Sequence, residues 1–337
     1  MQSICTIILA AGKGTRLKSA RPKVMHEILG LPLIFYPIDI ARRLDSSVIA
    51  VVGHGREVVG PYLERFSITQ VVQDPPLGTG HAVMVARDAL KESPATEVVI
   101  LPGDMPLIQY SSLASLLDIF RSSRAPIGIL TAVLPDAFGY GRIIRKADGS
   151  VSAIVEHNDA TEEQREIREI NTGVFAVDKK FLLAALDGLT PDNAKGEYYI
   201  TDIVKMAPSA VSFTVPDFNE AHGINSRSQL AHAASLMQRR INMSHMDEGV
   251  TLIDPDTVWI SPLATIGNDV EIWPGVCILG KTTIDSGVKI MPNTWINNSH
   301  IGTRCTVGNS CLLENTSIDM DSDIPAYSRI QEKRQAD

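Results

Sequence analysis

The chain has 337 residues, 44% of them hydrophobic and 21% charged, and its formal net charge at pH 7 is −8. This length predicts about two domains, and this composition excludes disordered, collagen-like and disulfide-stapled proteins. The negative charge disfavours a duplex nucleic-acid binder, so we expect no nucleic-acid partner, whereas a small anionic ligand needs only a local cationic pocket.

The first apolar run, residues 4–11, predicts a buried strand. It is too short to span a bilayer and leads into a glycine-rich segment instead of a cleavage site, so we expect no targeting segment and no membrane partner. The four cysteines include no C-x-x-C pair, which argues against zinc and against a disulfide framework. We therefore expect a reducing compartment, the cytoplasm.

Up to about residue 225, short β-branched runs alternate with helical patterns, which is typical of a parallel sheet covered by helices on both faces. The predicted strands are residues 5–10, 48–53, 68–72, 98–101 and 127–133. The predicted helices are residues 33–44, 80–90 and 111–121, the last with Ser111 as its N-cap. Residues 1–225 are therefore predicted to form a doubly wound α/β domain.

A linker helix is predicted over residues 226–249, with Ser226 as its cap and an apolar stripe formed by Leu230, Ala234, Met237 and Ile241. The pattern then changes to a period of six that begins at Ile260 and runs to Ile296. After a slip of one residue it continues through Ile301 and Val307. Such a period predicts a left-handed β-helix, over residues 250–325, in which three hexapeptides form one coil. A polar tail, residues 326–337, follows.

A glycine-rich segment and two cations follow the first predicted strand: Leu9-Ala10-Ala11-Gly12-Lys13-Gly14-Thr15-Arg16 and then Pro22-Lys23. Small residues here let the backbone approach a ligand at the carboxyl edge of the sheet. The Rossmann and Walker A patterns both fail, since Leu17 stands where a third glycine is needed and Lys13 lacks its flanking residues. Arg16 and Lys23 indicate a counter-charge for a polyphosphate, the alternative being an exposed surface pair.

This segment resembles the signature of sugar-nucleotide pyrophosphorylases, and further motifs resemble, in order, those of the N-acetylglucosamine-1-phosphate uridyltransferase family. They are Gln73 with Leu77-Gly78-Thr79-Gly80, Pro102-Gly103-Asp104, Gly139-Tyr140-Gly141-Arg142, Val155-Glu156-His157, Glu169-Ile170-Asn171-Thr172-Gly173, Glu197-Tyr198-Tyr199-Ile200-Thr201-Asp202 and Gly223-Ile224-Asn225. In bacteria this activity usually belongs to the first half of a bifunctional, GlmU-type protein whose second half is a left-handed β-helix acetyltransferase. The resemblance implies a Rossmann-like nucleotidyltransferase domain that joins UTP and N-acetylglucosamine 1-phosphate with Mg²⁺ as cofactor.

The resemblance implies that Arg16 and Lys23 are catalytic and that Asp104 and Asn225 are Mg²⁺ ligands. Asp104 follows a predicted strand, so its carboxylate lies at the carboxyl edge of the sheet, where a metal that bridges phosphates needs a hard oxygen ligand. Without the family resemblance, Asp104 could equally be a turn residue instead of a metal ligand. Asn225 could equally be a helix cap.

The substrate contacts are also implied by resemblance. The nucleotide would contact Leu9, Ala10, Ala11, Gly12 and Gly103, its uracil would contact Gln73, Gly78 and Thr79, and the sugar would contact Gly141, Glu156, Asn171, Tyr199 and Thr201. Uracil offers one imide donor and two carbonyl acceptors, which an amide and backbone groups match. The alternative for each is an ordinary loop or surface residue. No function is assigned to His54, His81 or His157, because a sugar phosphate is already anionic and needs no general base.

Two departures from the family pattern limit these expectations. Beyond residue 324, Arg329 alone resembles an acetyl-site residue, so acetyltransferase activity is predicted to be absent. Pro102 stands where family members often carry a larger residue, which leaves thymine as the base, or glucose or N-acetylgalactosamine as the sugar, as alternatives. A non-catalytic sugar-nucleotide-binding scaffold is a further alternative. It is disfavoured because all four predicted phosphate and metal ligands are present: Arg16, Lys23, Asp104 and Asn225. The β-helix predicts a homo-oligomer, which by resemblance is a trimer.

Overall fold

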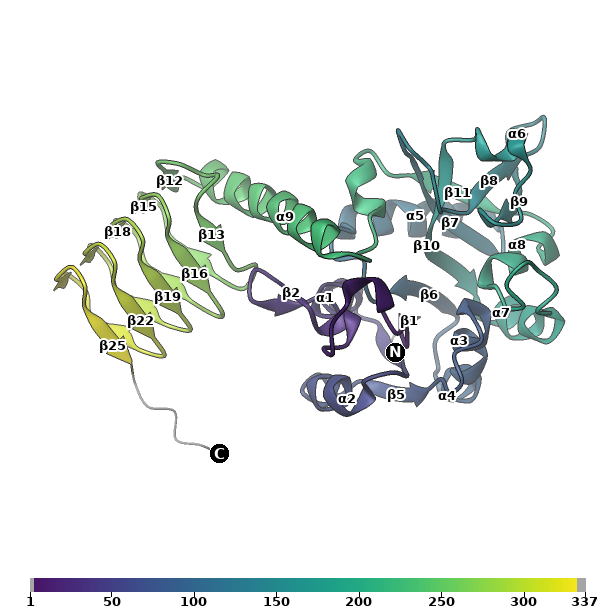
Figure 1. The fold of residues 1–337 in the computed structure, drawn as a ribbon, viewed down its shortest axis with the longest axis horizontal. Coiled ribbons are helices and arrows are strands. Elements are labelled where there is room, and N and C mark those ends of the chain that lie inside the picture. The colour runs from purple at the N-terminus through teal and green to yellow at the C-terminus, as the bar shows by residue number, and fades with distance from the viewer. Residues whose placement is uncertain (1–2, 332–337) are drawn as a thin grey trace. The chain divides into compact units, whose positions relative to one another are not determined.

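The computed structural model describes residues 3–331, which divide into two compact units. Within the described residues, the first comprises 3–26 and 32–229, and the second comprises 27–31 and 230–331 (Figure 1). The predicted boundaries at residues 225 and 249 stay a prediction, and residues 332–337 of the predicted polar tail lie outside the described part. None of the described helices combines the length and the hydrophobicity needed to cross a membrane.

The first unit is built on a nine-stranded sheet with the order β11-β7-β10-β6-β1-β4-β5, to which β8 and β9 are attached through β10. Its strands are β1 (Ile4–Ala10), β4 (Ser47–Val52), β5 (Thr69–Val72), β6 (Glu97–Pro102), β7 (Ile127–Val133), β8 (Arg142–Arg145), β9 (Val151–Val155), β10 (Glu169–Asp178) and β11 (Val211–Thr214). The five predicted strands are confirmed to within about one residue at each end, in keeping with the uncertainty of strand boundaries.

The sheet is mixed, whereas the sequence predicts a wholly parallel one. Strand β10 runs antiparallel to both β6 and β7, while β1 is parallel to β4 and β6. The five predicted strands are parallel to one another, and the antiparallel strand is β10, which the sequence analysis did not predict because its first half alternates between buried and half-buried residues. The α/β class itself is confirmed.

Helices cover both faces of this sheet. Successive residues of β1 belong to different cores, as Ile7 packs in one apolar cluster and Ile8 in another, and both side chains are fully buried. This is why β1 lacks a polar face and reads as one apolar run. The helices are α1 (Phe35–Arg43), α2 (Arg56–Glu64), α3 (Thr79–Val85), α4 (Arg87–Glu92), α5 (Tyr110–Ser123), α6 (Glu162–Arg165), α7 (Lys179–Ala185) and α8 (Ile203–Met206).

Two helix predictions need correction. The predicted helix 80–90 is two helices, α3 and α4, which meet at Ala86. The predicted cap Ser111 lies inside α5, whose N-cap is Gln109. The first turn of α5 is stabilised from elsewhere in the chain: the Glu220 carboxylate accepts the Gln109 N–H at 2.9 Å, and no local sequence pattern reveals such a partner.

The helix α9 (Arg227–Asp247) leads into the second unit. The predicted cap is confirmed, because Ser226 Oγ accepts the backbone N–H of Gln229 at 3.2 Å. Farther along, the buried side chains of Gln238 and Asn242 both donate to the carbonyl oxygen of Val258, at 2.7 and 2.9 Å. These bonds attach α9 to the first coil of the repeat.

The second unit is a β-helix of hexapeptide repeats, as predicted, made of three sheets in which every neighbouring pair of strands is parallel. One sheet contains β12 (Thr251–Leu252), β15 (Glu271–Ile272), β18 (Lys289–Ile290), β21 (Thr306–Val307) and β24 (Asp323–Ile324). The second contains β13 (Trp259–Ile260), β16 (Cys277–Leu279), β19 (Trp295–Asn297), β22 (Leu312–Glu314) and β25 (Arg329–Gln331). The third contains β14 (Thr265–Ile266), β17 (Thr283–Ile284), β20 (His300–Ile301) and β23 (Ser317–Ile318). A short pair, β2 (Glu27–Ile28) and β3 (Leu31–Pro32), completes the strands.

The residues of the six-residue period fill the interior of the β-helix. Ile260, Ile278 and Ile296 are fully buried and stack in register. Ile278 pairs with Ile296, 18 residues on, whereas Ile296 pairs with Leu313, 17 residues on. The one-residue slip in the sequence is therefore one coil shortened at a turn, and the apolar stack continues through it.

Candidate active site

An open pocket of about 380 Å³ lies where the carboxyl ends of β1 and β6 meet the start of α3. Parallel strands present their carboxyl ends at one edge of a sheet, which is where α/β proteins bind ligands. Among the predicted site residues, those that line this pocket are Leu9, Ala10, Ala11, Gly12, Lys23, Gln73, Gly78, Thr79, Asp104, Glu156, Asn171 and Thr201. The remaining predicted residues, which do not line it, are Arg16, Gly103, Gly141, Tyr199 and Asn225.

Glycines allow the close backbone packing beneath this pocket. Gly14 has a φ of 59°, and a Cβ there would lie 2.6 Å from Lys23 Cβ, so only glycine lets the loop after β1 close against the lysine. Gly103 donates its N–H to the Leu9 carbonyl oxygen at 2.9 Å, and a Cβ on Gly103 would lie at the same distance from that oxygen. Gly103 thus supports the floor of the pocket from behind.

Three residues predicted from separate motifs meet at one point. Lys23 begins a short 3-10 helix (Lys23–Met25), and its Nζ forms an ion pair with the Asp104 carboxylate. The same Nζ donates to Asn225 Oδ1 at 2.8 Å. The Ile224 N–H donates to the Asp104 backbone carbonyl at 3.0 Å, which holds the two oxygen-bearing segments together.

This cluster fits a divalent cation. The Asp104 carboxylate and the Asn225 amide oxygen are hard oxygen donors, and both already converge on one cationic atom, Lys23 Nζ. Within residues 3–331, no group of three or more His, Cys, Asp or Glu side chains is arranged to hold a metal. A metal here would therefore take most of its ligands from phosphates and water, which is the coordination that Mg²⁺ prefers beside nucleotides.

At the α3 end of the pocket, Gln73 has an exposed fraction of 5%. Its Nε2 donates to the Gly78 carbonyl oxygen at 2.9 Å. Gly78 has a φ of 106°, and a Cβ there would lie 2.5 Å from the Tyr198 carbonyl oxygen. Thr79 Oγ1 accepts the Ile200 N–H at 3.2 Å, so these contacts hold the start of α3 against the segment around Tyr198.

At the opposite end, Glu156 accepts a hydrogen bond from Thr201 Oγ1 at 3.2 Å. Burial raises the pKa of this carboxyl, and the Thr201 hydroxyl partly offsets that rise. A Cβ on Gly141 would lie 3.3 Å from both carboxylate oxygens, so a glycine leaves space beside them. Asn171 lies next to this group, and its Oδ1 accepts the Gly173 N–H at 3.0 Å.

Neither Arg16 nor Tyr199 forms a side-chain hydrogen bond within residues 3–331, although the charge of Arg16 acts on Tyr140 and opposes the rise that burial causes in its pKa. Arg16 is exposed, and the structure gives it no hydrogen bond or ion pair with any residue between 3 and 331. Tyr199 is buried beside the pocket, its hydroxyl has no partner among the described residues, and burial raises its pKa to about 12. Tyr199 therefore packs behind the pocket in this structure.

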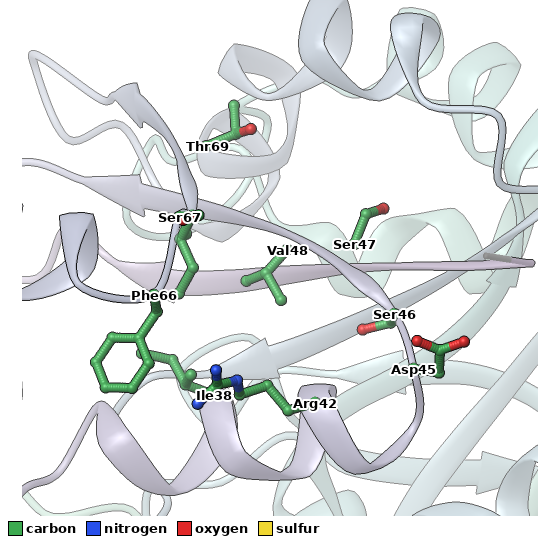
Figure 2. A pocket seen from close by; sticks show the side chains of 10 residues that line it. Ile38, Arg42, Asp45, Ser46, Ser47, Val48, Phe66, Ser67 and Thr69 are labelled. Atoms are coloured by element: carbon green, nitrogen blue, oxygen red, sulfur yellow. The ribbon is translucent and has the colours of Figure 1, made fainter. Parts of the chain in front are cut away.

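A second pocket, of about 420 Å³, lies at the amino ends of β4 and β5 (Figure 2). Figure 2 shows the Arg42 side chain reaching toward Phe66, and its guanidinium lies 5.2 Å from the centre of that ring. No predicted site residue lines this pocket, and it opens at the edge of the sheet where α/β proteins rarely bind ligands. The pocket around Lys23 is therefore the candidate active site.

Comparison with known proteins agrees with this geometry. Residues 6–166 match the model of the MobA-like NTP transferase domain. The chain is 44% identical to the bifunctional protein GlmU of Thermoanaerobacter pseudethanolicus over 318 residues, which is 93% of this chain and 69% of the relative. It is also 42% identical to the bifunctional protein GlmU of Listeria innocua over 330 residues, 96% of this chain and 72% of that relative.

The chain belongs to the GlmU family. It is therefore a nucleotidyltransferase of the UDP-N-acetylglucosamine pyrophosphorylase type. The functional roles that the sequence analysis assigned to individual residues stay proposals. Twelve of these residues line one pocket.

Sequence reasoning assigned no role to Tyr140 and Glu220, two residues that support the Asp104 cluster of this GlmU-family site. Burial raises the pKa of Tyr140, the Asp104 charge raises it further, and a hydrogen bond with the Gly223 backbone opposes the rise. Tyr140 therefore lies against the Asp104 cluster, and its motif was noted for Gly141 alone. Glu220 is fully buried five residues before Asn225 and bonds to the start of α5, but a single acid in a loop gives no sequence signal.

We expect the variant Lys23→Met to bind Mn²⁺ more tightly than the parent protein. In the parent protein, the Lys23 ammonium and a divalent cation would compete for the same two oxygens, those of Asp104 and Asn225. A metal that displaces Lys23 breaks charge-assisted hydrogen bonds worth about 1.5–3 kcal/mol, which corresponds to roughly 10- to 100-fold in Kd. Titration followed by electron paramagnetic resonance measures this affinity without turnover. The exposed Lys13 provides the control, since Lys13→Met leaves the cluster intact. Equal or weaker binding by Lys23→Met would contradict a shared cation position.

Proposed function

We propose that this chain converts UTP and N-acetyl-α-D-glucosamine 1-phosphate to UDP-N-acetylglucosamine and pyrophosphate. An oxygen of the sugar phosphate forms a bond to the α-phosphorus of UTP, and the bond from that phosphorus to the bridging oxygen breaks, so that pyrophosphate leaves with the electron pair. The observation that carries this proposal is the cluster of Lys23, Asp104 and Asn225 at the edge of a pocket that also contains Gln73 and Glu156.

The cations neutralise the charge that builds up on the phosphates. Lys23 lies in the pocket and donates to the transferring phosphate, while the exposed Arg16 donates to the leaving pyrophosphate. A Mg²⁺ held by Asp104 and Asn225 supplies Lewis-acid neutralisation of phosphate oxygens when bound. The nucleophile is already anionic, so the protein contributes positioning and electrostatics without a general base.

Substrate groups are assigned to the two ends of the pocket. Gln73 and the backbone around Gly78 contact the uracil, which offers one donor and two acceptors. Glu156 and Asn171 accept from the hydroxyl and acetamido groups of the sugar, and the lack of a side chain at Gly141 keeps the Glu156 carboxylate uncrowded. A buried carboxylate that accepts several hydroxyl donors strongly disfavours a sugar that lacks them.

The test is pyrophosphate release with Mg²⁺ and UTP, in parallel reactions with N-acetylglucosamine 1-phosphate, N-acetylgalactosamine 1-phosphate and glucose 1-phosphate. We expect rapid release with the first sugar and release at least about tenfold slower with the others. A further reaction with dTTP tests the base. Preference for another sugar or for dTTP would overturn this substrate assignment. If the protein binds UTP but releases no pyrophosphate with any of the sugars, the non-catalytic scaffold would be favoured.

Acetyl transfer is tested separately, with glucosamine 1-phosphate and acetyl-CoA. The absence of this activity from these 337 residues stays a prediction.

We also propose a cytoplasmic location, where UTP is available and thiols stay reduced. The four cysteines, Cys5, Cys277, Cys305 and Cys311, are all free in the structure.

We propose that the chain forms a homotrimer through one face of its β-helix. One row of outward positions on the sheet that contains β13 is an apolar column of Trp259, Cys277, Trp295 and Leu312, which are paired in register and followed by Arg329. The second outward row of this sheet is mostly polar: Leu279, Asn297, Glu314 and Gln331. The exposed fraction of Trp295 is 42%. The outward positions of the other two sheets are polar, among them Glu271, Lys289, Thr283 and His300. Copies related by a closed symmetry axis would bury this one apolar face.

The variant Trp295→Glu is expected to lower the mass of the assembly in sedimentation equilibrium to that of the monomer, because it buries a charge in the contact. Thr283→Glu, on a polar face of the same coils, is the matched control and is expected to leave the mass unchanged. A trimer in both variants would contradict this contact, and a monomeric parent protein would contradict the trimer itself.

A further inference from the structure

The orientation of the Gln73 amide is settled by its neighbours. Gly78 offers a carbonyl oxygen, which can only accept, so the atom 2.9 Å from it must be the nitrogen, Nε2. The same nitrogen lies 3.2 Å from His81 Nδ1. Since Nε2 carries only two hydrogens, these two acceptors use both of them.

His81 must then act as the acceptor of the second hydrogen. An imidazole Nδ1 accepts only when it carries no proton, so the neutral tautomer with its proton on Nε2 is the one that fits. The His81 ring is also held in place, because it lies 6.3 Å from the Tyr198 ring, tilted by 37°. The turn into α3 thereby places two acceptors on one side of Gln73.

The other end of the amide, Oε1, is left available to a ligand in the pocket. The side chain is 95% buried and lines the pocket, yet the structure gives Oε1 no hydrogen-bond partner among residues 3–331. An acceptor at the wall of a pocket loses its contact with water when a ligand fills the pocket, so a ligand that binds here must supply a donor to Oε1. Uracil supplies one at its ring N3–H, whereas cytosine has an acceptor at the same ring position.

We propose that His81 is a specificity-determining positioning residue, which fixes the Gln73 amide so that the site selects a pyrimidine nucleotide with a ring N–H over cytidine nucleotides. The inference rests on the proposed contact between Gln73 and the base. We call this fixed orientation of the Gln73 amide the His81 lock. With the lock in place, the cytosine ring nitrogen of CTP, an acceptor, lies opposite Gln73 Oε1, which is also an acceptor. Without the lock, the amide turns over and offers Nε2 to cytosine, at the loss of one hydrogen bond to Gly78.

Two substitutions separate hydrogen bonding from packing at this position. His81→Phe keeps a ring against Tyr198 and removes the acceptor, whereas His81→Asn loses the ring and keeps an acceptor oxygen at the δ position. A residue that only packs would be rescued by Phe and damaged by Asn. The lock requires the opposite result, so the pair of variants distinguishes the two roles even where either one lowers the overall rate.

The experiment measures kcat/KM for UTP and for CTP, with N-acetylglucosamine 1-phosphate as the second substrate, together with the Kd of each nucleotide by calorimetry. We expect His81→Phe to lower the ratio of UTP to CTP at least about tenfold, and His81→Asn to keep it within about threefold of the parent protein. An unchanged ratio in His81→Phe, or loss of the ratio in His81→Asn alone, would overturn the inference.

The variant Gln73→Ala separates this inference from the proposed function. If Gln73→Ala loses the preference for UTP and His81→Phe retains it, the contact with the base stands and the lock is wrong. If Gln73→Ala retains the preference, the proposed uracil contact is itself wrong, and the role of His81 fails with it. Loss of the preference in Gln73→Ala and His81→Phe, with retention in His81→Asn, supports both.

Discussion

The site depends on a single cationic atom, Lys23 Nζ, which contacts the Asp104 carboxylate and the Asn225 amide oxygen. These three residues come from the segment after β1, the loop after β6 and the segment before α9. Only the convergence of strand ends at one edge of the sheet brings such distant segments together. On a protein with a net charge of −8, this arrangement keeps a local positive charge beside the pocket while pairing it with an acid.

Several contacts hold that cluster in place. Gly14 lets the loop after β1 close on Lys23, and the Ile224 N–H binds the Asp104 carbonyl. The buried Glu220 carboxylate accepts from Gln109 N and Ser112 Oγ at the start of α5, which joins the chain before Asn225 to the chain after Asp104. The charged groups are therefore positioned by backbone packing and buried hydrogen bonds, which lowers the cost of organising them around phosphates.

Much of the fold was predictable because its patterns are periodic. The six-residue repeat from Ile260 to Ile296 corresponds to a buried stack, and the run around Ile7 corresponds to a central strand. The antiparallel strand β10 was missed, because its first half alternates between buried and half-buried residues and lacks the continuous apolar run of the central strands. The site shows a similar limit: Asp104 was assigned from the family resemblance together with its place after a strand, while Tyr140 and Glu220 act through contacts between segments far apart in the sequence.

The central claim is that phosphoryl chemistry depends on the Asp104 carboxylate within this cluster. The most direct measurement is the rate of UDP-N-acetylglucosamine synthesis by Asp104→Asn at saturating UTP and Mg²⁺, alongside its thermal unfolding midpoint. The variant keeps the shape of the side chain and an oxygen for Lys23 and removes only the charge. We predict a rate lower by roughly 10²–10³-fold with an unchanged midpoint. A rate within about threefold of the parent protein would contradict the account.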